Sequence, residues 1–413
     1  MRSGGVRGIL LGASACLFAA DLTAGEPEAD WQSYRSNDDT QNIHEYKPEP
    51  LPDLKPGERP AADSLEGGLW MVMDRVEEEL RRSGRVVDDP ALNAYLRRIV
   101  CRLAPDYCNE LRIYVVRTPH FNATMAPNGV MQVWTGLLLR CQNEAQLAYI
   151  LGHEIAHYRR RHSVQNWRNA SNTADAMAFV QLFTAAAGVG FVGTLAQLAG
   201  ASAIFAYSRD QEREADELGL RMVIEAGYDP REAAKSWRGL MQERDADPDS
   251  EDKPIFFASH PPTEERVETL DAKAAETDVT DRDIGADRFA DAVRPLRSTW
   301  LQDELKRRRL EQSAVLLQRL AEADMSGELR FFQGEIHRLR RTDDDNERAI
   351  DLYLQALDGS DAPAETHRSL GFVYWDTGDD DKAAQSFRTF LSLQPDAGDA
   401  AMIQSYIDKL DEN

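Results

Sequence analysis

The sequence predicts an α+β, mainly helical domain followed by an all-α repeat domain. Two short runs rich in β-branched and aromatic residues, at 111–117 and 131–136, have the composition of strands. Longer stretches with the apolar spacing of amphipathic helices surround them. From about residue 300 onward the patterns are helical and repeat. We therefore expect four segments: a signal peptide (1–25), an extended acidic and Pro-rich leader (26–65), the mixed domain (66–290) and the repeat domain (291–413).

The composition limits the partners of the protein. The chain has 413 residues with 48 Lys or Arg and 71 Asp or Glu, so its formal net charge is -23. This acidity argues against a nucleic-acid partner, because phosphates would be repelled. A hydrophobic content of 42% excludes a wholly disordered protein.

The N-terminus has the layout of a secretory signal peptide. Arg2 and Arg7 precede an uncharged apolar run at 8–20, and small residues follow at 24–25. The run is too short to span a membrane comfortably. A lipoprotein signal ending before Cys16 is the alternative. Either reading places the mature chain outside the cytoplasm.

The cysteines allow two arrangements in an oxidising compartment. Cys101 and Cys108 are seven residues apart across an expected helix end and could form a disulfide. Cys141 would then stay free. The alternative is three unpaired thiols.

The first elements of the mixed domain follow from local signals. Helices are expected at 66–86 and 90–104, and Asp89 can cap the second, with Pro90 at its first position. The strands at 111–117 and 131–136 come next. The turn sequence Pro-Asn-Gly at 127–129 precedes the second strand.

Helical patterns then dominate. A helix is expected from about 144 to 161 with Asn143 as its N-cap, and another from about 210 to 226. Asp229 followed by Glu232 predicts a capping box at the next helix. The stretch 176–207 carries no charge. We interpret it as two buried or interfacial helices of a soluble domain, with at most peripheral membrane contact as the alternative.

The C-terminal repeats match the tetratricopeptide pattern. One copy starts near Ala364 and a shorter match precedes it, with extra residues in its turn at 342–346. Helices at 300–323 and 398–411 would flank the two copies, because each repeat buries its apolar face only against a neighbour. The residues that carry the match are Leu370, Gly371, Tyr374, Ala383, Phe387 and Pro395, and earlier Gly334, Ala349, Tyr353 and Ala356.

The sequence GHEIAH indicates a metal site. It places His153 and His157 four residues apart, and hence on one face of a helix, where both can bind one ion. Glu154 can face a water bound to that ion. Further along, Glu212 and Asp216 also share a helical face. Glu212 could supply a third ligand, and Asp216 could accept a hydrogen bond from a ligand histidine. The alternative for the second pair is a solvated acidic face.

These motifs resemble those of the HtpX and CAAX-prenyl-protease type of zinc metallopeptidases. The resemblance rests on HExxH followed by SRxxExxAD at 208–216, on the segments at 121–138, and on Ser-His-Pro-Pro at 259–262 with Arg266. A signal peptide in front and repeats behind make the whole chain similar to the BepA-type periplasmic proteases of Gram-negative bacteria. The resemblance implies a zincin-type metalloprotease domain and a tetratricopeptide-repeat domain.

The resemblance also implies roles for residues. His153, His157 and Glu212 would bind one Zn2+ per chain, and Glu154 would act as general base. His260 would be a fourth zinc ligand that keeps the enzyme inactive. The alternative is that His260 is an ordinary exposed histidine of a loop. Substrate would add to an edge strand that contains the three residues Asn122, Ala123 and Thr124, unless this is a protected edge.

The function that we expect is secreted, zinc-dependent hydrolysis of unfolded or misassembled envelope proteins. The repeats could contact the outer-membrane assembly machinery, and no nucleic acid is expected. The alternative is a non-proteolytic periplasmic chaperone or adaptor, against which the intact HExxH and Glu212 argue.

Overall fold

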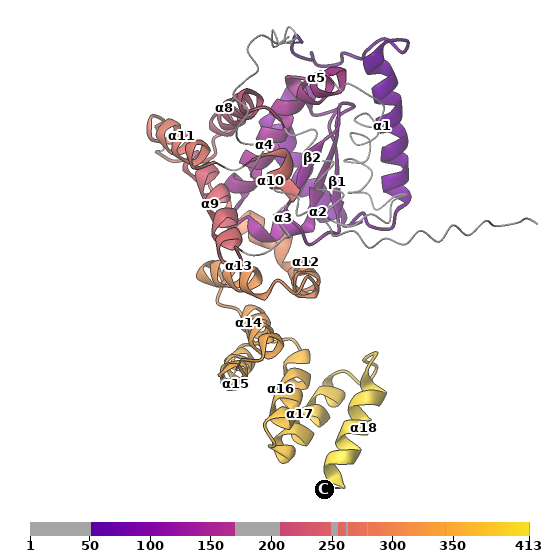
Figure 1. Cartoon of the computed structure of the whole chain (residues 1–413), viewed down its shortest axis with the longest axis vertical. Helices are drawn as coiled ribbons and strands as arrows, with labels where there is room; N and C mark the ends of the chain where they lie inside the picture. The colour runs from indigo at the N-terminus through magenta and orange to yellow at the C-terminus, as the bar shows by residue number, and fades with distance from the viewer. Residues whose placement is uncertain are drawn as a thin grey trace, which may run out of the picture. The chain divides into compact units, whose positions relative to one another are not determined.

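The computed structural model describes residues 51–169, 207–248, 255–261, 263–278, 280–342 and 344–412. The expected signal peptide, most of the expected leader and all but the last residue of the uncharged stretch 176–207 lie outside these ranges. Within them, no helix combines the length and apolarity needed to cross a membrane. The described chain is mainly helical and contains one small sheet, as the sequence predicts (Figure 1).

Within the described residues, the expected helices and strands of the mixed domain are present, with ends within a few residues of those predicted. In chain order the elements are α1 (Leu65–Arg82), α2 (Pro90–Leu103), a short 3-10 turn η2 (Pro105–Tyr107), β1 (Arg112–Val116), β2 (Ala123–Met125), β3 (Val130–Trp134), α3 (Thr135–Arg140), α4 (Glu144–Arg159), α5 (His162–Asn169), α8 (Arg209–Glu225), α9 (Arg231–Asp245), α10 (Ile255–Ser259) and α11 (Glu264–Ala275).

The sheet has the strand order β1-β3-β2. Strands β1 and β3 are parallel, whereas β2 and β3 form an antiparallel hairpin. The hairpin turns at Gly129, which has φ 87° and where a Cβ would lie 2.8 Å from the Glu110 carbonyl oxygen, so only glycine fits. Helix α1 lies on one side of the sheet and α4 on the other (Figure 1). Strand β2, which contains Ala123 and Thr124 of the expected substrate-binding strand, lies at an edge of this sheet.

Caps set the ends of the central helices. Asn143 Oδ1 accepts a 2.9 Å hydrogen bond from the Gln146 backbone N–H at the start of α4, as predicted. The predicted capping box at α9 is wrong. The Glu232 carboxylate instead accepts bonds from the buried Asn143 and Gln146 amides, at 2.8 and 2.9 Å. Two buried amide donors thus replace the backbone N–H as its partners, and the contact joins α9 to the start of α4.

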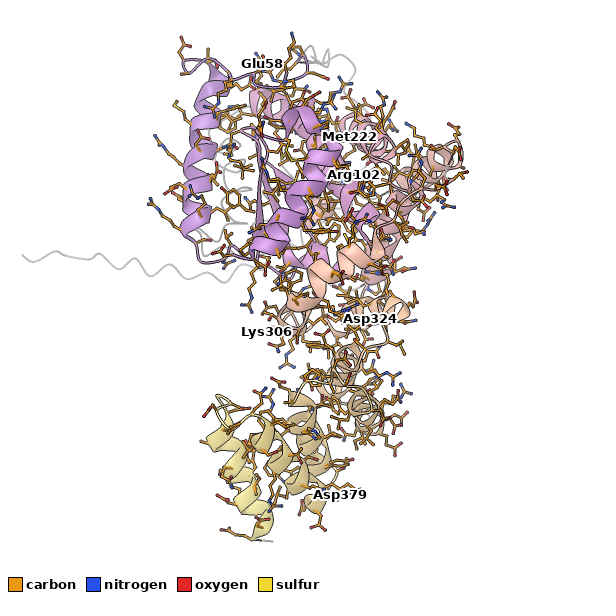
Figure 2. All side chains as sticks on the ribbon, turned by 180° about the vertical axis from the view of Figure 1, so that it is seen from behind. Glu58, Arg102, Met222, Lys306, Asp324 and Asp379 are labelled. Atoms are coloured by element: carbon orange, nitrogen blue, oxygen red, sulfur yellow. A yellow bond between two sulfur atoms is a disulfide. The ribbon has the colours of Figure 1, made fainter. Side chains whose placement is uncertain are left out.

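Helix α2 packs beside α4 and α8. Figure 2 shows this side of the domain, with Arg102 of α2 and Met222 of α8 labelled. A disulfide joins Cys101 of α2 to Cys108, and Cys141 is free and buried. The first of the two cysteine arrangements is therefore the one in the structure.

The C-terminal part is a succession of helices, each in contact with the next. They are α12 (Ala286–Lys306), α13 (Leu310–Ala323), α14 (Gly327–Arg340), α15 (Asp345–Leu357), α16 (Glu365–Asp376), α17 (Asp380–Leu393) and α18 (Ala400–Asp411). The two predicted repeats correspond to the pairs α14–α15 and α16–α17. In each pair a glycine of the first helix packs against an aromatic ring of the second and leaves no room for a Cβ: Gly334 on Tyr353, and Gly371 on Phe387. The expected boundary at 290/291 lies inside α12.

Candidate active site

Helices α4 and α8 supply most of the site. α4 carries His153, Glu154 and His157, and α8 carries Glu212 and Asp216. Two glycines let the helix backbones touch at this level. A Cβ on Gly219 of α8 would lie 2.8 Å from the backbone nitrogen of His153, and Gly152 of α4 faces Gly219 in turn. Because neither glycine has a side chain, the two helices lie close enough for their metal-binding groups to meet.

Four potential metal-ligating groups converge. His153, His157, Glu212 and His260 each offer one ligand atom, and these atoms all lie within 4.8 Å of one another. The Nε2 atoms of His153 and His157 are 3.0 Å apart, and His260 Nδ1 is 2.8 Å from Glu212 Oε1. All four side chains are buried. The structure therefore brings together the three ligands predicted from α4 and α8 and the loop histidine predicted from the resemblance.

The donor set fits zinc. Nitrogen and carboxylate donors in a group of four are typical of zinc sites. Burial lowers the pKa of His157 well below its ordinary value, so its ring is neutral and can donate a lone pair. Three buried carboxylates (Glu154, Glu212 and Asp216) face one buried guanidinium, that of Arg266. Arg266 matches only one of the three when all are ionised, and a divalent cation would balance the remaining negative charge.

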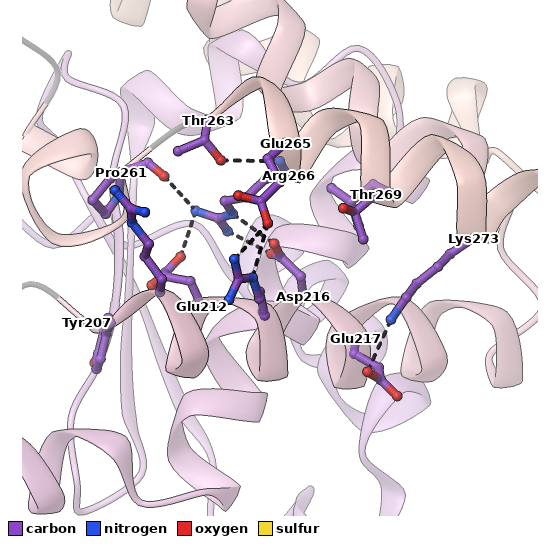
Figure 3. A pocket seen from close by; sticks show the side chains of 13 residues that line it. Tyr207, Glu212, Asp216, Glu217, Pro261, Thr263, Glu265, Arg266, Thr269 and Lys273 are labelled. Carbon is purple, nitrogen blue, oxygen red and sulfur yellow. Dashed lines mark hydrogen bonds and ion pairs between the residues drawn. The ribbon is translucent and has the colours of Figure 1, made fainter. Parts of the chain in front are cut away.

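Asp216 lies where the sequence predicted, beside a ligand histidine. Its Oδ1 is 3.0 Å from His153 Nδ1 and also accepts a 2.8 Å hydrogen bond from the Tyr149 hydroxyl. Arg266 of α11 donates two 2.7 Å bonds to the Asp216 carboxylate and lies 2.6 Å from Glu212 Oε2 (Figure 3). Burial alone would raise the pKa of Asp216, but Arg266 and His153 outweigh it and hold that pKa well below its usual range. The carboxylate is therefore charged and orients His153.

Glu154 is the buried carboxylate without a matching partner. Burial raises its pKa above the ordinary value, although His260 and His153 oppose this shift. Among the described residues, no group hydrogen-bonds its Oε1 atom. The nearest ring nitrogen is His260 Nε2, at 3.5 Å. A buried carboxylate oxygen in this position can accept a hydrogen bond from a water molecule.

His260 is held in the site by ring stacking and backbone bonds. Its ring stacks on Phe256 of α10 at 4.4 Å, and Phe256 stacks on Trp237 of α9 at 5.5 Å. The backbone N–H of Tyr207, just before α8, donates to the Ser259 carbonyl at 3.1 Å. The loop after α10 is thus tied to both α8 and α9.

The expected substrate strand is covered. Asn122, Ala123 and Thr124 are all buried, and the neighbouring Phe121 packs edge-on against Phe256 at 5.1 Å. The segment that carries His260 therefore also contacts the chain that leads into β2. A substrate could not add to this strand without a movement of the covering groups.

Sequence reasoning missed the contacts of His162. It lies five residues after His157, a spacing that places it off the metal-binding face of a continuous helix. The structure places its Nδ1 at 2.9 Å from His157 Nδ1 and its Nε2 at 3.0 Å from Glu214 Oε2. The reason is a turn between α4 and α5, where Arg161 adopts φ 55°. No helical periodicity signals such a turn.

A pocket of about 460 Å³ lies between α8 and α11 (Figure 3). Glu212, Asp216 and Arg266 form part of its wall, together with Pro261 of the loop that carries His260. The pocket therefore adjoins the ligand carboxylate on the side of the Arg266 contact.

Comparison with known proteins agrees with this geometry. Residues 90–274 match the model of peptidase family M48. The chain is 28% identical over 197 residues to the putative beta-barrel assembly-enhancing protease of Vibrio cholerae serotype O1, covering 46% of this chain and 40% of that protein. It is 31% identical over 195 residues to the mitochondrial metalloendopeptidase OMA1 of Schizosaccharomyces pombe, covering 45% and 54%.

A third relative is the beta-barrel assembly-enhancing protease of Escherichia coli K12, with 25% identity over 228 residues, covering 52% of this chain and 45% of that protein. The chain thus matches about half of the length of these relatives. The region that matches the family model, residues 90–274, contains α4, α8 and the loop with His260. Residues 90–274 are thus similar to peptidase family M48, and about half of the chain is similar to proteins named beta-barrel assembly-enhancing protease.

Proposed function

We propose that this protein is a zinc-dependent endopeptidase. One observation carries the proposal: four buried ligand groups converge beside a buried carboxylate, Glu154, that has no hydrogen-bond partner on Oε1 among the described residues. A purely structural zinc site has no use for such a carboxylate.

The residues divide the work as follows. His153, His157 and Glu212 would hold the zinc ion. When bound there, zinc would lower the pKa of a coordinated water to about 7 and polarise the scissile carbonyl. Glu154 would accept a proton from the attacking water and deliver it to the leaving amine. Burial raises the pKa of Glu154 above its ordinary value, which favours acceptance of the proton from water.

We propose further that the structure is the resting, closed state. A catalytic zinc site keeps one position open, whereas here a fourth protein group, His260, points Nδ1 at the ligand cluster. Its Nε2 faces Glu154, and its loop covers the lead-in to β2. His260 would therefore exclude both the water and the substrate until it leaves.

The substrates that we propose are unfolded or misassembled proteins of the bacterial envelope. An edge strand binds substrate through backbone bonds and selects for extended chains rather than for a particular sequence. The names of the relatives, which refer to beta-barrel assembly, support substrates in the bacterial envelope. The expected signal peptide supports a periplasmic location for the protein itself. The C-terminal hairpins, which we interpret as tetratricopeptide repeats at 291–413, would recruit the substrate or an assembly machine.

The test is degradation of an unfolded model protein by the purified mature chain, with zinc content quantified. We expect His260→Ala to cleave faster than the wild type, and His260→Ala combined with Glu154→Gln not to cleave. His367→Ala, on α16 and outside the metal-ligating cluster, is the matched histidine control and should behave as the wild type.

Two outcomes would contradict parts of this proposal. Equal rates for the wild type and His260→Ala would contradict the role of His260 as an inhibitory fourth ligand. No cleavage by any form, although each binds zinc, would favour the chaperone or adaptor alternative. In cells, Glu154→Gln separates these functions, because an adaptor would keep its function without this carboxylate.

A further inference from the structure

The second ring nitrogen of His157 faces away from the metal-ligating cluster. His157 Nε2 lies 3.0 Å from His153 Nε2 and 3.4 Å from Glu212 Oε1, so this nitrogen belongs to the cluster. Nδ1 faces His162 Nδ1 at 2.9 Å. His162 is 1% exposed, and its other nitrogen lies 3.0 Å from Glu214 Oε2. A line of hydrogen bonds thus runs outward from His157, through the two ring nitrogens of His162, to the carboxylate of Glu214.

The carboxylate fixes the direction of every bond in this line. A carboxylate only accepts, so His162 must carry its proton on Nε2 and donate it to Glu214. A neutral His162 then has a lone pair on Nδ1, which accepts from His157 Nδ1–H. His157 is left with a lone pair on Nε2, the nitrogen that faces the cluster. The wrong tautomer of His157 would place two lone pairs against each other at Nδ1.

We propose that His162 and Glu214 are positioning residues, which hold His157 in the tautomer that binds metal through Nε2. The inference rests on the proposed zinc site and extends it. The two ligand histidines are then oriented differently: His153 by a direct contact with the buried Asp216, and His157 through an intermediate histidine. Their outermost partners differ too, since the Glu214 side chain is 40% exposed and pairs with Arg160 at 2.7 Å.

The arrangement also explains the turn after α4. Arg161 adopts a left-handed conformation that non-glycine residues rarely adopt, and it places His162 against His157. Tyr207 stacks on the His157 ring at 3.8 Å, so the ring is held by its face as well as by its edge. Both contacts restrict the rotation of His157.

The test compares two nearly isosteric replacements. His162→Asn keeps an acceptor close to the position of Nδ1, whereas His162→Leu keeps the volume and removes the acceptor. Zinc affinity is measured by competition with a chromophoric chelator, and ligand geometry by the visible absorption of the cobalt-substituted protein. We expect His162→Leu to weaken zinc binding by about 10- to 100-fold and to alter the cobalt spectrum. His162→Asn should recover most of both.

Glu214→Ala provides a second test if His162→Leu does not fold. We expect a smaller loss of zinc affinity, below about tenfold, because water can replace a half-exposed carboxylate. Glu217→Ala is the matched control on the same helix, since its carboxylate pairs with Lys273 and Arg221 instead. It should bind zinc like the wild type.

The outcomes are distinguishable. Equal losses in His162→Leu and His162→Asn would show that volume rather than the acceptor matters, and would overturn the proposal. So would wild-type affinity and an unchanged spectrum in His162→Leu, or equal affinities for Glu214→Ala and Glu217→Ala. If the unmodified protein binds neither zinc nor cobalt, the proposed metal site itself fails.

Discussion

Two of the buried charge clusters among the described residues differ in how completely their charges are matched. The arginine–glutamate cluster (Arg140, Glu243, Glu304, Arg307 and Arg319) joins α3, α9, α12 and α13. Arg140 bonds to Glu243 at 2.7 Å and to Glu304 at 3.0 Å. Arg307 also pairs with Glu304, and Arg319 with Glu243. Each carboxylate in this cluster therefore has two guanidinium partners.

The metal-ligating cluster has the opposite balance. In and around it, the three carboxylates of Glu154, Glu212 and Asp216 face one guanidinium, that of Arg266. Glu154 Oε1 has no hydrogen-bond partner among the described residues. Burial of charge by itself therefore does not identify a functional site in this chain. An excess of buried carboxylates indicates one here, because a divalent cation and a water molecule would supply the partners that the described side chains do not.

Removal of the proposed base should have the largest effect. Glu154→Gln removes the proton acceptor but keeps the ligands, so we expect proteolysis to fall by about 10²- to 10⁴-fold while zinc content is unchanged. Cleavage rates in the His260→Ala background give the measurement. Glu217→Gln, on an exposed face of α8, is the control and should leave the rate unchanged. Residual activity within tenfold of the parent would contradict the assigned role.

Disruption of the arginine–glutamate cluster should destabilise the protein but spare the metal site. Arg140→Met leaves Glu243 and Glu304 buried with one cation fewer each, at a cost of about 3 kcal/mol in the free energy of unfolding. Urea denaturation checks the stability, and zinc content checks the site. Loss of zinc from a folded Arg140→Met protein would show that the two clusters are not independent.

Loss of the Asp216 charge should weaken metal binding. Asp216→Asn retains the shape of the side chain but no longer attracts Arg266 or orients His153 as a carboxylate does. We expect zinc affinity to fall by about 10- to 100-fold, measured by chelator competition. An unchanged affinity would mean that the ligand histidine needs no orienting group.

The smallest effect concerns pH. Burial would raise the pKa of Glu304, but Arg140, Arg307 and a bond from Ser313 lower it below its ordinary value of 4.5. Because the folded state favours the charged form, this stabilisation is complete well above pH 4.5 and is lost as the pH falls through the folded pKa. We expect the difference in unfolding free energy between the wild type and Glu304→Gln to shrink from pH 7 to pH 4. A constant difference would contradict the pairing.

The fold and the metal site differ in how far the sequence predicts them. Helical spacing places His153 with His157, and Glu212 with Asp216, on one face of a helix. The second pair was predictable as part of a metal site only together with the HExxH motif of the first. The prediction that His260 is a fourth ligand depended on the family resemblance, because the sequence of a loop does not indicate which other residues its side chains contact. His162 and the arginine–glutamate cluster were missed because they depend on a turn and on contacts between four helices. The capping box at Glu232 failed for the same reason: buried amides of another helix attract its carboxylate.

The central claim is that the unmatched cluster is a metal site, and zinc binding tests it most directly. The mature protein would be stripped with a chelator, dialysed and titrated with zinc, with bound metal and the thermal midpoint followed together. We predict one tightly bound zinc ion per chain, with unfolding stabilised by about 4 kcal/mol when zinc is at 1,000 times its dissociation constant. His153→Ala should lose both effects. No bound zinc in the wild type and an unchanged thermal midpoint would contradict the account.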